Sequence, residues 1–518
     1  MTKVKKGKRQ RAYRPKTQTG CLTCKIRRVK CDEALPACLR CTSTGRTCDG
    51  YAHTKTPTEA VTILAGPSFE IQVSPRSKRS FAFFIQRTCL QLAGFFGSDF
   101  WERLILQAAH HEPAIRHAII AIGSRHELAV QQTANIDTVG VFALGQYNLA
   151  IKHLLDSSPT NGNRSVDVYF VSSILFACFE NMQGNNSLAI NHIQSGVKLL
   201  RETAYDPHTG TLRHQQFGST SRINSYASLE TYAKIFALLD SQASKMIGDY
   251  QRPIVASSHP LTCQIYGDAP ISFSSINEAK STFEFGACLF SGNLDAKLSD
   301  DAVQFPHKST EDRSHLANLM AKFWLAVQEL MQSKRTQLTQ KEQLAAAVLQ
   351  LNVLVTWISF EVELRYPNSP ANWDDFMDQV LEMLLLGEKI VSYINESGDN
   401  TVSFGWESGY IIPVYAVATN CRDHTIRHRA IAILRSVHRQ EGLWNSLLIA
   451  KAAKRVMEIE ETELRKEDDR ADGLKASEWF SSRPLLKIDG NGGRLHYTRN
   501  TREGHRSPQE VIEEVFSW

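Results

Sequence analysis

The chain has 518 residues, of which 42% are apolar and 9% aromatic, so it can bury a sizeable core, and a wholly disordered protein is excluded. Its net charge of +5 hides an asymmetry, because residues 1–50 carry 14 Lys and Arg against 3 Asp and Glu, whereas the rest is slightly acidic. A short basic segment on a near-neutral body predicts a polyanion-binding module attached to a separate globular domain.

The chain opens with a basic arm, residues 1–16, in which eight Lys and Arg occur without an acidic residue. This composition is typical of a nuclear-localisation signal or of an arm that contacts the DNA backbone; a merely solvated tail is the alternative. The residues we assign to this role are Lys5, Lys6, Lys8, Arg9 and Arg11. No apolar stretch follows Met1, so we expect no secretory signal, a reducing compartment that disfavours disulfides, and a nuclear protein.

Residues 17–50, here called the cysteine module, contain six cysteines in the doubled pattern Cys-x2-Cys-x6-Cys. The six are Cys21, Cys24, Cys31, Cys38, Cys41 and Cys48. Structural zinc takes four thiolate or imidazole ligands, and two zinc ions therefore need eight bonds. Six thiolates supply eight bonds if two of them bridge, and bridging by Cys21 and Cys38 preserves the internal symmetry. A disulfide framework and a single metal with two spare thiols are the alternatives. We expect two zinc ions that provide folding free energy on the order of 10 kcal/mol.

The two repeats differ in charge, because four cations lie between Cys24 and Cys31. These cations are Lys25, Arg27, Arg28 and Lys30. We expect a short helix that starts near Cys24 and projects the two arginines toward base edges in a DNA groove, while the two lysines meet phosphates. Solvated or purely phosphate-neutralising charges are the alternative for all four.

The stretch from Cys21 to Asp32, followed by Pro36 to Cys41 and Gly45 to Cys48, resembles the fungal binuclear zinc-cluster transcription factors. The resemblance implies bridging by the cysteines at positions 21 and 38, and a CGG-type triplet read by the residues at 27 and 28. It also implies a loop proline at 36 that orders the two halves, although an ordinary turn proline fits equally well.

Residues 51–79 lack sustained helical periodicity and are rich in turn residues, which predicts a flexible linker. No series of three or more heptads follows the cysteines. We therefore favour monomeric binding, or a homodimer formed through the distal domain, over a coiled-coil zipper.

Residues 80–465 show helical periodicity throughout and predict an all-α regulatory domain, which makes the whole chain mainly α. We expect a helix beginning near Pro113, an αα-hairpin around Gly184, and an amphipathic face on 431–437. The series Leu344, Val348, Leu351, Val355 and Ile358 fits a core stripe or a coiled-coil seam. Segments such as 100–103, 112–118, 236–240 and 441–444 resemble the helical regulatory domain that often follows a fungal zinc cluster. The most apolar stretches are short or interrupted, so we expect no membrane-spanning helix.

Signals for chemistry in this domain are weak. The histidines at 110, 111, 117 and 126 do not share one helix face, and Cys421 near His424 and His428 has no catalytic signature, so we expect no enzyme. Residues 466–518 predict a polar tail whose acidic and aromatic residues suit an activation segment or a plain solvated terminus.

These observations predict a sequence-specific regulator of RNA polymerase II transcription that binds double-stranded DNA and contacts the transcription machinery or co-regulators. Analogy with the family suggests a pathway-specific regulator of secondary metabolism. The alternative is a zinc-dependent nuclear module that binds RNA or a protein. RNA readers stack bases on aromatic side chains, and none lies between Cys21 and Cys48.

Overall fold

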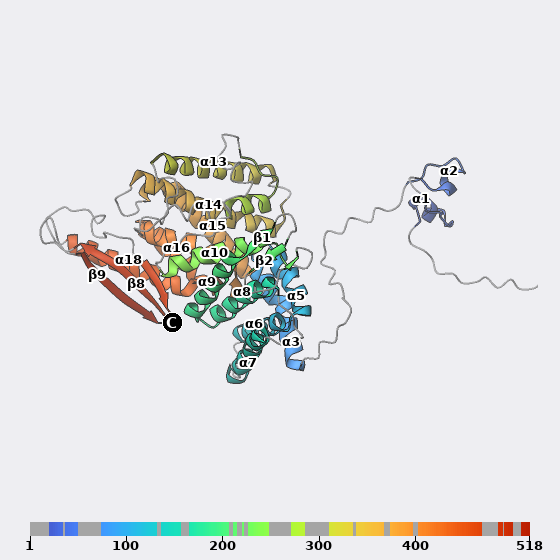
Figure 1. Ribbon diagram of the computed structural model, residues 1–518. Coiled ribbons are helices and arrows are strands. Elements are labelled where there is room, and N and C mark those ends of the chain that lie inside the picture. Colours follow the sequence, from blue (N-terminus) through green and yellow to red (C-terminus); the bar gives the residue numbers. More distant parts are fainter. Residues whose placement is uncertain are drawn as a thin grey trace, which may run out of the picture. The chain divides into compact units, whose positions relative to one another are not determined.

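The computed structural model divides the chain into two compact units, Met1–Gln72 and Val73–Trp518 (Figure 1). The described residues are 20–34, 37–49, 74–131, 136–156, 165–206, 211–214, 220–221, 226–247, 271–284, 310–334, 338–366, 373–396, 402–468, 485–489, 492–500 and 509–517. The predicted basic arm, Pro36 and most of the predicted linker lie outside them. The sixteen-residue arm therefore stays a prediction.

The first unit contains two short helices, α1 (Leu22–Ile26) and α2 (Leu39–Thr42). The two helices hold an equivalent place in the two cysteine repeats, since each begins directly after the first cysteine of its repeat. Helices of five and four residues cannot persist alone in water, so their stability has to come from what the cysteines bind.

The first helix of the second unit begins at Pro75, inside the stretch predicted as linker, because Ser74 caps this helix and Pro75 occupies its first turn. Its amino-terminal half packs α6 against α3, α7 and α8, and α9 against α8 and α10. The elements of this half are α3 (Pro75–Phe83), the π-helical turn η1 (Phe84–Thr88), α4 (Cys89–Leu92), the π-helical turn η2 (Phe100–Leu104), α5 (Ile105–His111), α6 (Pro113–Gln131), α7 (Ile136–Leu155), α8 (Val166–Met182), α9 (Asn186–Glu202) and α10 (Leu229–Ile247).

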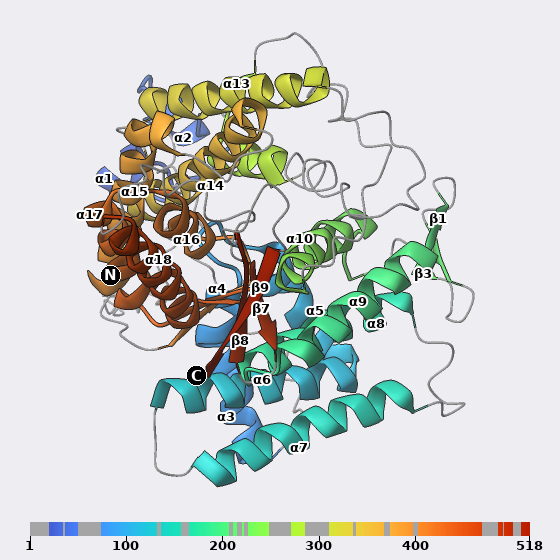
Figure 2. The same cartoon turned by 90° about the vertical axis from the view of Figure 1, so that its left-hand side faces the viewer.

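The carboxy-terminal half packs α14 between α13 and α15, and α17 against α15, α16 and α18. In both views of the domain, α13 and α7 lie at opposite ends of it (Figures 1 and 2). The elements of this half are α13 (Thr310–Lys334), α14 (Gln340–Arg365), the 3-10 turn η6 (Asp374–Phe376), α15 (Met377–Glu396), α16 (Ile411–Asn420), α17 (His424–Ser436) and α18 (Ser446–Asp468).

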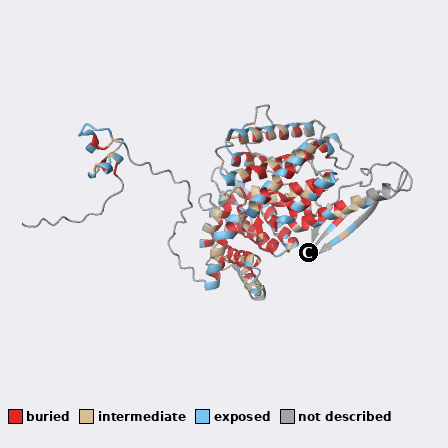
Figure 3. Cartoon of the chain, turned by 180° about the vertical axis from the view of Figure 1, so that it is seen from behind, coloured by how far each residue is buried: buried red, intermediate tan, exposed pale blue. Residues whose placement is uncertain are grey.

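The helical predictions are confirmed where a long apolar face marks the helix. Helix α6 starts at Pro113, and α8 and α9 form the predicted hairpin around Gly184, whose φ of +81° suits a residue without a Cβ. Buried residues gather on the helix faces that point into the domain (Figure 3). The series from Leu344 to Ile358 belongs to this core, which decides between the two interpretations of its spacing.

Over Gln340–Val362, helix α14 is long and apolar enough to cross a membrane by length and composition alone, although the sequence predicted no membrane-spanning helix. However, 61% of its most apolar window is buried inside the domain, and α13, α15 and α16 pack against it. A capping box formed by Thr339 and Glu342 fixes its first turn. Packing in the core accounts for its apolar sequence.

Three small sheets join the helices, which the all-α prediction did not include. Two antiparallel sheets comprise β1 (Ala204–Asp206), β2 (Thr211–Arg213) and β3 (Thr220–Ser221), and β7 (Leu485–Asp489), β8 (Gly492–Asn500) and β9 (Gln509–Ser517). The last three lie within the predicted polar tail, and a bidentate ion pair from Arg455 of α18 to Glu514 of β9 holds that sheet against the helix.

The third sheet pairs β4 (Ser403–Gly405) in parallel with β5 (Arg439–Glu441), which pairs antiparallel with β6 (Trp444–Asn445). It holds a buried ion pair, in which Arg439 Nε donates to Glu441 Oε1 at 2.8 Å. The Glu441 carboxylate also accepts the backbone N–H groups of Tyr410 (3.3 Å) and Ile411 (3.0 Å), at the start of α16. This carboxylate therefore joins the sheet to the amino terminus of a helix, where negative charge is stabilised.

Candidate metal centre and nucleic-acid interface

The cysteines themselves start the two short helices of the cysteine module. The Sγ of Cys21 accepts the backbone N–H of Cys24 at 3.4 Å and so caps α1. Cys38 holds the same N-cap position before α2, but its side chain makes no capping hydrogen bond. The predicted helix start near Cys24 is therefore wrong by two residues, because a thiol acts as the cap and α1 begins at Leu22. Sequence rules for caps look for Ser, Thr, Asp or Asn and pass over cysteine.

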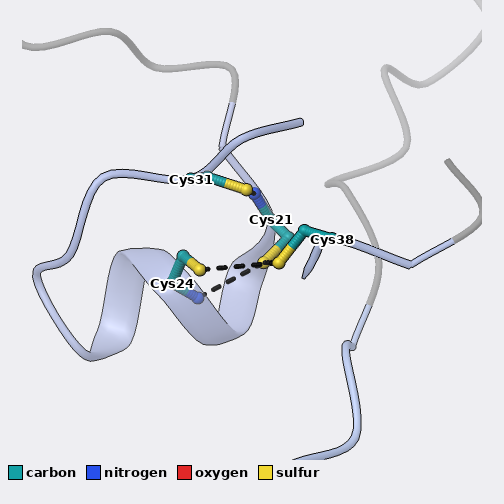
Figure 4. Close-up of side chains that lie close together, drawn as sticks. All are labelled: Cys21, Cys24, Cys31 and Cys38. Carbon is teal, nitrogen blue, oxygen red and sulfur yellow. Dashed lines mark hydrogen bonds between the residues drawn. The ribbon is translucent and has the colours of Figure 1, made fainter. Parts of the chain in front are cut away.

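The sulfur atoms converge as metal ligands do. Cys21 Sγ lies 3.6 Å from Cys38 Sγ, and Cys24 Sγ lies 3.7 Å from Cys38 Sγ (Figure 4). The edge of a ZnS4 tetrahedron with bonds of about 2.3 Å is roughly 3.8 Å, so these separations fit zinc and not a disulfide of about 2.05 Å. Two groups of four thiols form, and both contain Cys21 and Cys38: one adds Cys24 and Cys31, the other Cys41 and Cys48.

The thiols need a cation to become thiolates together. Desolvation raises the pKa of Cys21 to about 12 and raises the pKa of Cys38 further. The pKa of Cys31 is lowered to about 7, mainly because its sulfur accepts the backbone N–H of Cys21, with a further bond from Glu33 N. Zinc supplies the positive charge that such a cluster of sulfurs lacks, and it acts there as a structural ion.

Comparison with known proteins agrees with this geometry. The model of the fungal Zn(2)-Cys(6) binuclear cluster domain matches residues 19–57, and the fungal specific transcription factor domain matches residues 80–284. The chain belongs to the fungal zinc-cluster transcription regulators. The predicted cofactor, two zinc ions shared by six cysteines, is thereby confirmed, since the cluster domain is binuclear and the two groups of thiols share two members.

Proteins similar to this regulator are themselves named as transcription regulators. The aspercryptin biosynthesis cluster-specific transcription regulator atnN of Emericella nidulans is 23% identical, over 97% of this chain and 96% of its own length. The transcription regulator lscL of Purpureocillium lilacinum is 26% identical over 35% of this chain and 48% of its own length. The transcriptional regulatory protein moc3 of Schizosaccharomyces pombe is 45% identical over 11% of each chain. No solved structure matches the chain.

Two further polar contacts stabilise the regulator's metal centre. The spacing of the cysteines does not predict them. The Asp32 carboxylate accepts the backbone N–H groups of Leu39 (3.0 Å) and Arg40 (3.1 Å) in the first turn of α2. These bonds, first of all the one from Arg40, lower the pKa of Asp32. Thr23 Oγ1 donates to Asp49 Oδ2 at 2.8 Å and accepts Asp49 N at 2.9 Å, which ties the end of the module to α1. Partners 7 to 26 residues apart leave no periodic signal in the sequence.

The four cations of the first repeat occupy different settings. Lys25 lies in α1 and Lys30 follows it, and both are exposed. Arg27 is the C-cap of α1 and half-buried; its Nη1 is buried with no hydrogen-bond partner among the described residues. Arg28 is exposed and has a φ of +53°, in the left-handed region. Arg27 and Arg28, which were predicted to play the same role, therefore differ in solvent accessibility.

Arg28 holds a position where glycine is the usual residue. Val29 N donates to Cys24 O at 3.1 Å and Arg28 N donates to Lys25 O at 3.2 Å, the two bonds of a Schellman motif that ends α1. Its left-handed residue is normally glycine, because a side chain there costs roughly 1–2 kcal/mol. A strained residue persists where its side chain is needed, and such residues gather at functional sites.

The other histidines and the cysteine singled out in the sequence occupy different places in the helical domain. His117 stacks on His153 with ring centroids 5.1 Å apart, and His126 is buried against Phe83 and Phe404. Cys421 is buried, and burial raises its pKa, so it is no poised nucleophile. His424 and His428, in contrast, lie close together on α17.

Proposed function

We propose that this regulator is a nuclear, sequence-specific DNA-binding protein that controls RNA polymerase II transcription and performs no catalysis. In this proposal the six cysteines hold the two zinc ions, and Lys25, Arg27, Arg28 and Lys30 contact DNA. The segment around α1 enters the major groove at a CGG-type triplet, because Arg bidentate to guanine O6 and N7 is the commonest specific contact there. The observation that carries the proposal is the exposed Arg28 held in a left-handed conformation.

Charge supports the same assignment. Fourteen Lys and Arg in residues 1–50 provide an electrostatic affinity for phosphate that falls steeply with salt. We assign Lys5, Lys6, Lys8, Arg9 and Arg11 to nuclear import or to backbone contacts, and the larger helical domain to co-regulators or the transcription machinery. The name of the Emericella relative supports a role in regulating one biosynthetic gene cluster, and the missing heptads favour a monomer or a dimer through the helical domain.

Replacing Arg28 by alanine is expected to weaken binding to a CGG-containing duplex by about 1–3 kcal/mol and to relax sequence preference at the triplet. Replacing it by glycine should have the same effect on DNA while stabilising the cysteine module by about 1 kcal/mol, because the left-handed strain disappears. Fluorescence anisotropy with CGG and substituted duplexes at fixed salt measures the first effect, and resistance of the module to urea measures the second.

Lys30→Ala is the matched comparison, since it also removes one exposed cation. If Lys30 contacts a phosphate, Lys30→Ala should weaken binding equally to the CGG-containing duplex and to the substituted duplex. It should also lower the slope of log affinity against log salt concentration by about 1. If Arg28→Ala shows that uniform loss and keeps the preference of the unmodified chain for CGG, Arg28 contacts phosphate and the proposed reader is wrong.

A further inference from the structure

Two histidines of the helical domain lie on one face of α17. His424 is its first residue and His428 lies one turn later, so the spacing of four residues places both rings on the same side. The ring centroids are 4.2 Å apart, at an angle of 62° between the planes. Asp423 fixes the start of the helix by accepting Ile426 N at 2.9 Å, so the backbone beneath His424 is anchored.

The adjacent helix α18 adds a carboxylate to this pair. Glu461 Oε1 lies 2.8 Å from His424 Nδ1, and the ligand atoms of His424, His428 and Glu461 all lie within 4.8 Å of one another. Ligand atoms around one zinc at about 2.1 Å are roughly 3.4 Å apart, so small side-chain rotations bring the three atoms to a common ion. The side chain of His424 is 66% exposed and that of Glu461 28% exposed, which leaves a path for the ion.

A partly buried ion pair one residue away joins the two helices. Arg427 is buried, donates from Nε to Ala418 O at 3.0 Å, and pairs through Nη1 with Glu460 of α18. Because Arg427 neutralises Glu460, Glu461 is the carboxylate of this pair that is left to face the histidines. The groups that would bind a cation are thus carried by two helices already fixed against each other.

We propose that His424, His428 and Glu461 form a second metal site in this regulator, which binds one divalent transition-metal ion. Two imidazoles and one carboxylate suit zinc, cobalt, nickel or copper, whereas calcium and magnesium prefer all-oxygen sites. Three protein ligands leave one position for water or a further ligand. An ion held there links α17 to α18, so the helical domain gains stability with the concentration of that metal.

The test uses the full-length chain with its cysteine cluster already loaded with zinc, and Co2+ as the probe. The chain is expected to take up one Co2+ in addition to its two zinc ions, with weak ligand-field absorption and no thiolate-to-cobalt charge-transfer bands. The same addition should raise the melting temperature of the helical domain. His428→Gln should weaken Co2+ binding more than about 10-fold and abolish the rise, although it leaves the contact between His424 and Glu461 in place.

The matched control is the double variant His110→Gln and His111→Gln, which removes two exposed histidines from α5 and should bind Co2+ like the unmodified chain. Three results overturn the proposal: no uptake of Co2+ beyond the zinc cluster, uptake that His428→Gln leaves unchanged, or uptake accompanied only by thiolate charge-transfer bands, which places the ion among the cysteines.

Discussion

Replacing Cys38 by serine is expected to release zinc from both metal positions and to abolish specific DNA binding. Cys38 belongs to both groups of four thiols, so its loss removes one ligand from each ion. Structural zinc contributes on the order of 10 kcal/mol of folding free energy, and helices as short as α1 and α2 do not persist without it. Zinc content by atomic emission should fall well below two ions per chain, and affinity for the specific site should fall by at least about 1,000-fold, toward non-specific binding.

Two comparisons make this result specific. Cys421→Ala removes a buried thiol from the helical domain and should keep both zinc ions and normal DNA binding. Cys48→Ser removes a ligand from one group only, and should retain more zinc than Cys38→Ser. A Cys38→Ser chain that holds two zinc ions and still binds DNA would show that Cys38 is not a bridging ligand.

Replacing Glu441 by alanine is expected to lower the free energy of unfolding of the helical domain by about 3–5 kcal/mol. The change leaves the buried Arg439 guanidinium without its carboxylate and removes the acceptor for Tyr410 N and Ile411 N at the start of α16. An uncompensated buried charge and unpaired buried N–H groups are both costly. Urea unfolding followed by far-ultraviolet circular dichroism measures the effect, because the helical domain contains most of the described helical residues.

Asp99→Ala provides the control, because the ion pair between Asp99 and Arg103 is exposed. The Asp99 side chain is 61% accessible and the Arg103 side chain 57%. Surface pairs of this kind contribute less than about 1 kcal/mol. A loss for Glu441→Ala no larger than that for Asp99→Ala would mean that the buried network does not hold the third sheet to α16. Zinc content should be the same in both variants.

The metal centre was predictable because its ligands are cysteines in one short, regular stretch. Two zinc ions need eight bonds from six thiolates, and this requirement predicts bridging by Cys21 and Cys38 from the sequence. The two groups of thiols in the structure share those two residues. The long helices were predictable for a similar reason, because each needs an apolar stripe that repeats with its own turn. The hairpin of α8 and α9 around Gly184 is one example.

What the sequence did not reveal depends on partners far apart in the chain. Strands of two or three residues, such as β4 to β6, are too short for an alternating pattern. The carboxylates of Asp32 and Glu441 accept hydrogen bonds from backbone groups 7 to 31 residues away. The left-handed conformation of Arg28 accompanies two backbone hydrogen bonds, from Arg28 N to Lys25 O and from Val29 N to Cys24 O, which no residue type in the sequence indicates. His424 and His428 alone did not predict a metal site. In the structure, α18 places Glu461 beside His424 and so supplies a third ligand group.

The assignment of DNA reading to the first cysteine repeat is tested by neutralising each repeat separately. Lys25→Ala with Arg28→Ala removes two exposed cations from the first repeat, and Arg40→Ala with Arg46→Ala removes two exposed cations from the second. The ratio of affinities for a CGG duplex and for the same duplex with the triplet scrambled is measured for each variant at one salt concentration. We expect this ratio to fall to about 1 in the first variant and to stay near that of the unmodified chain in the second. A ratio that survives in the first variant and is lost in the second would contradict it.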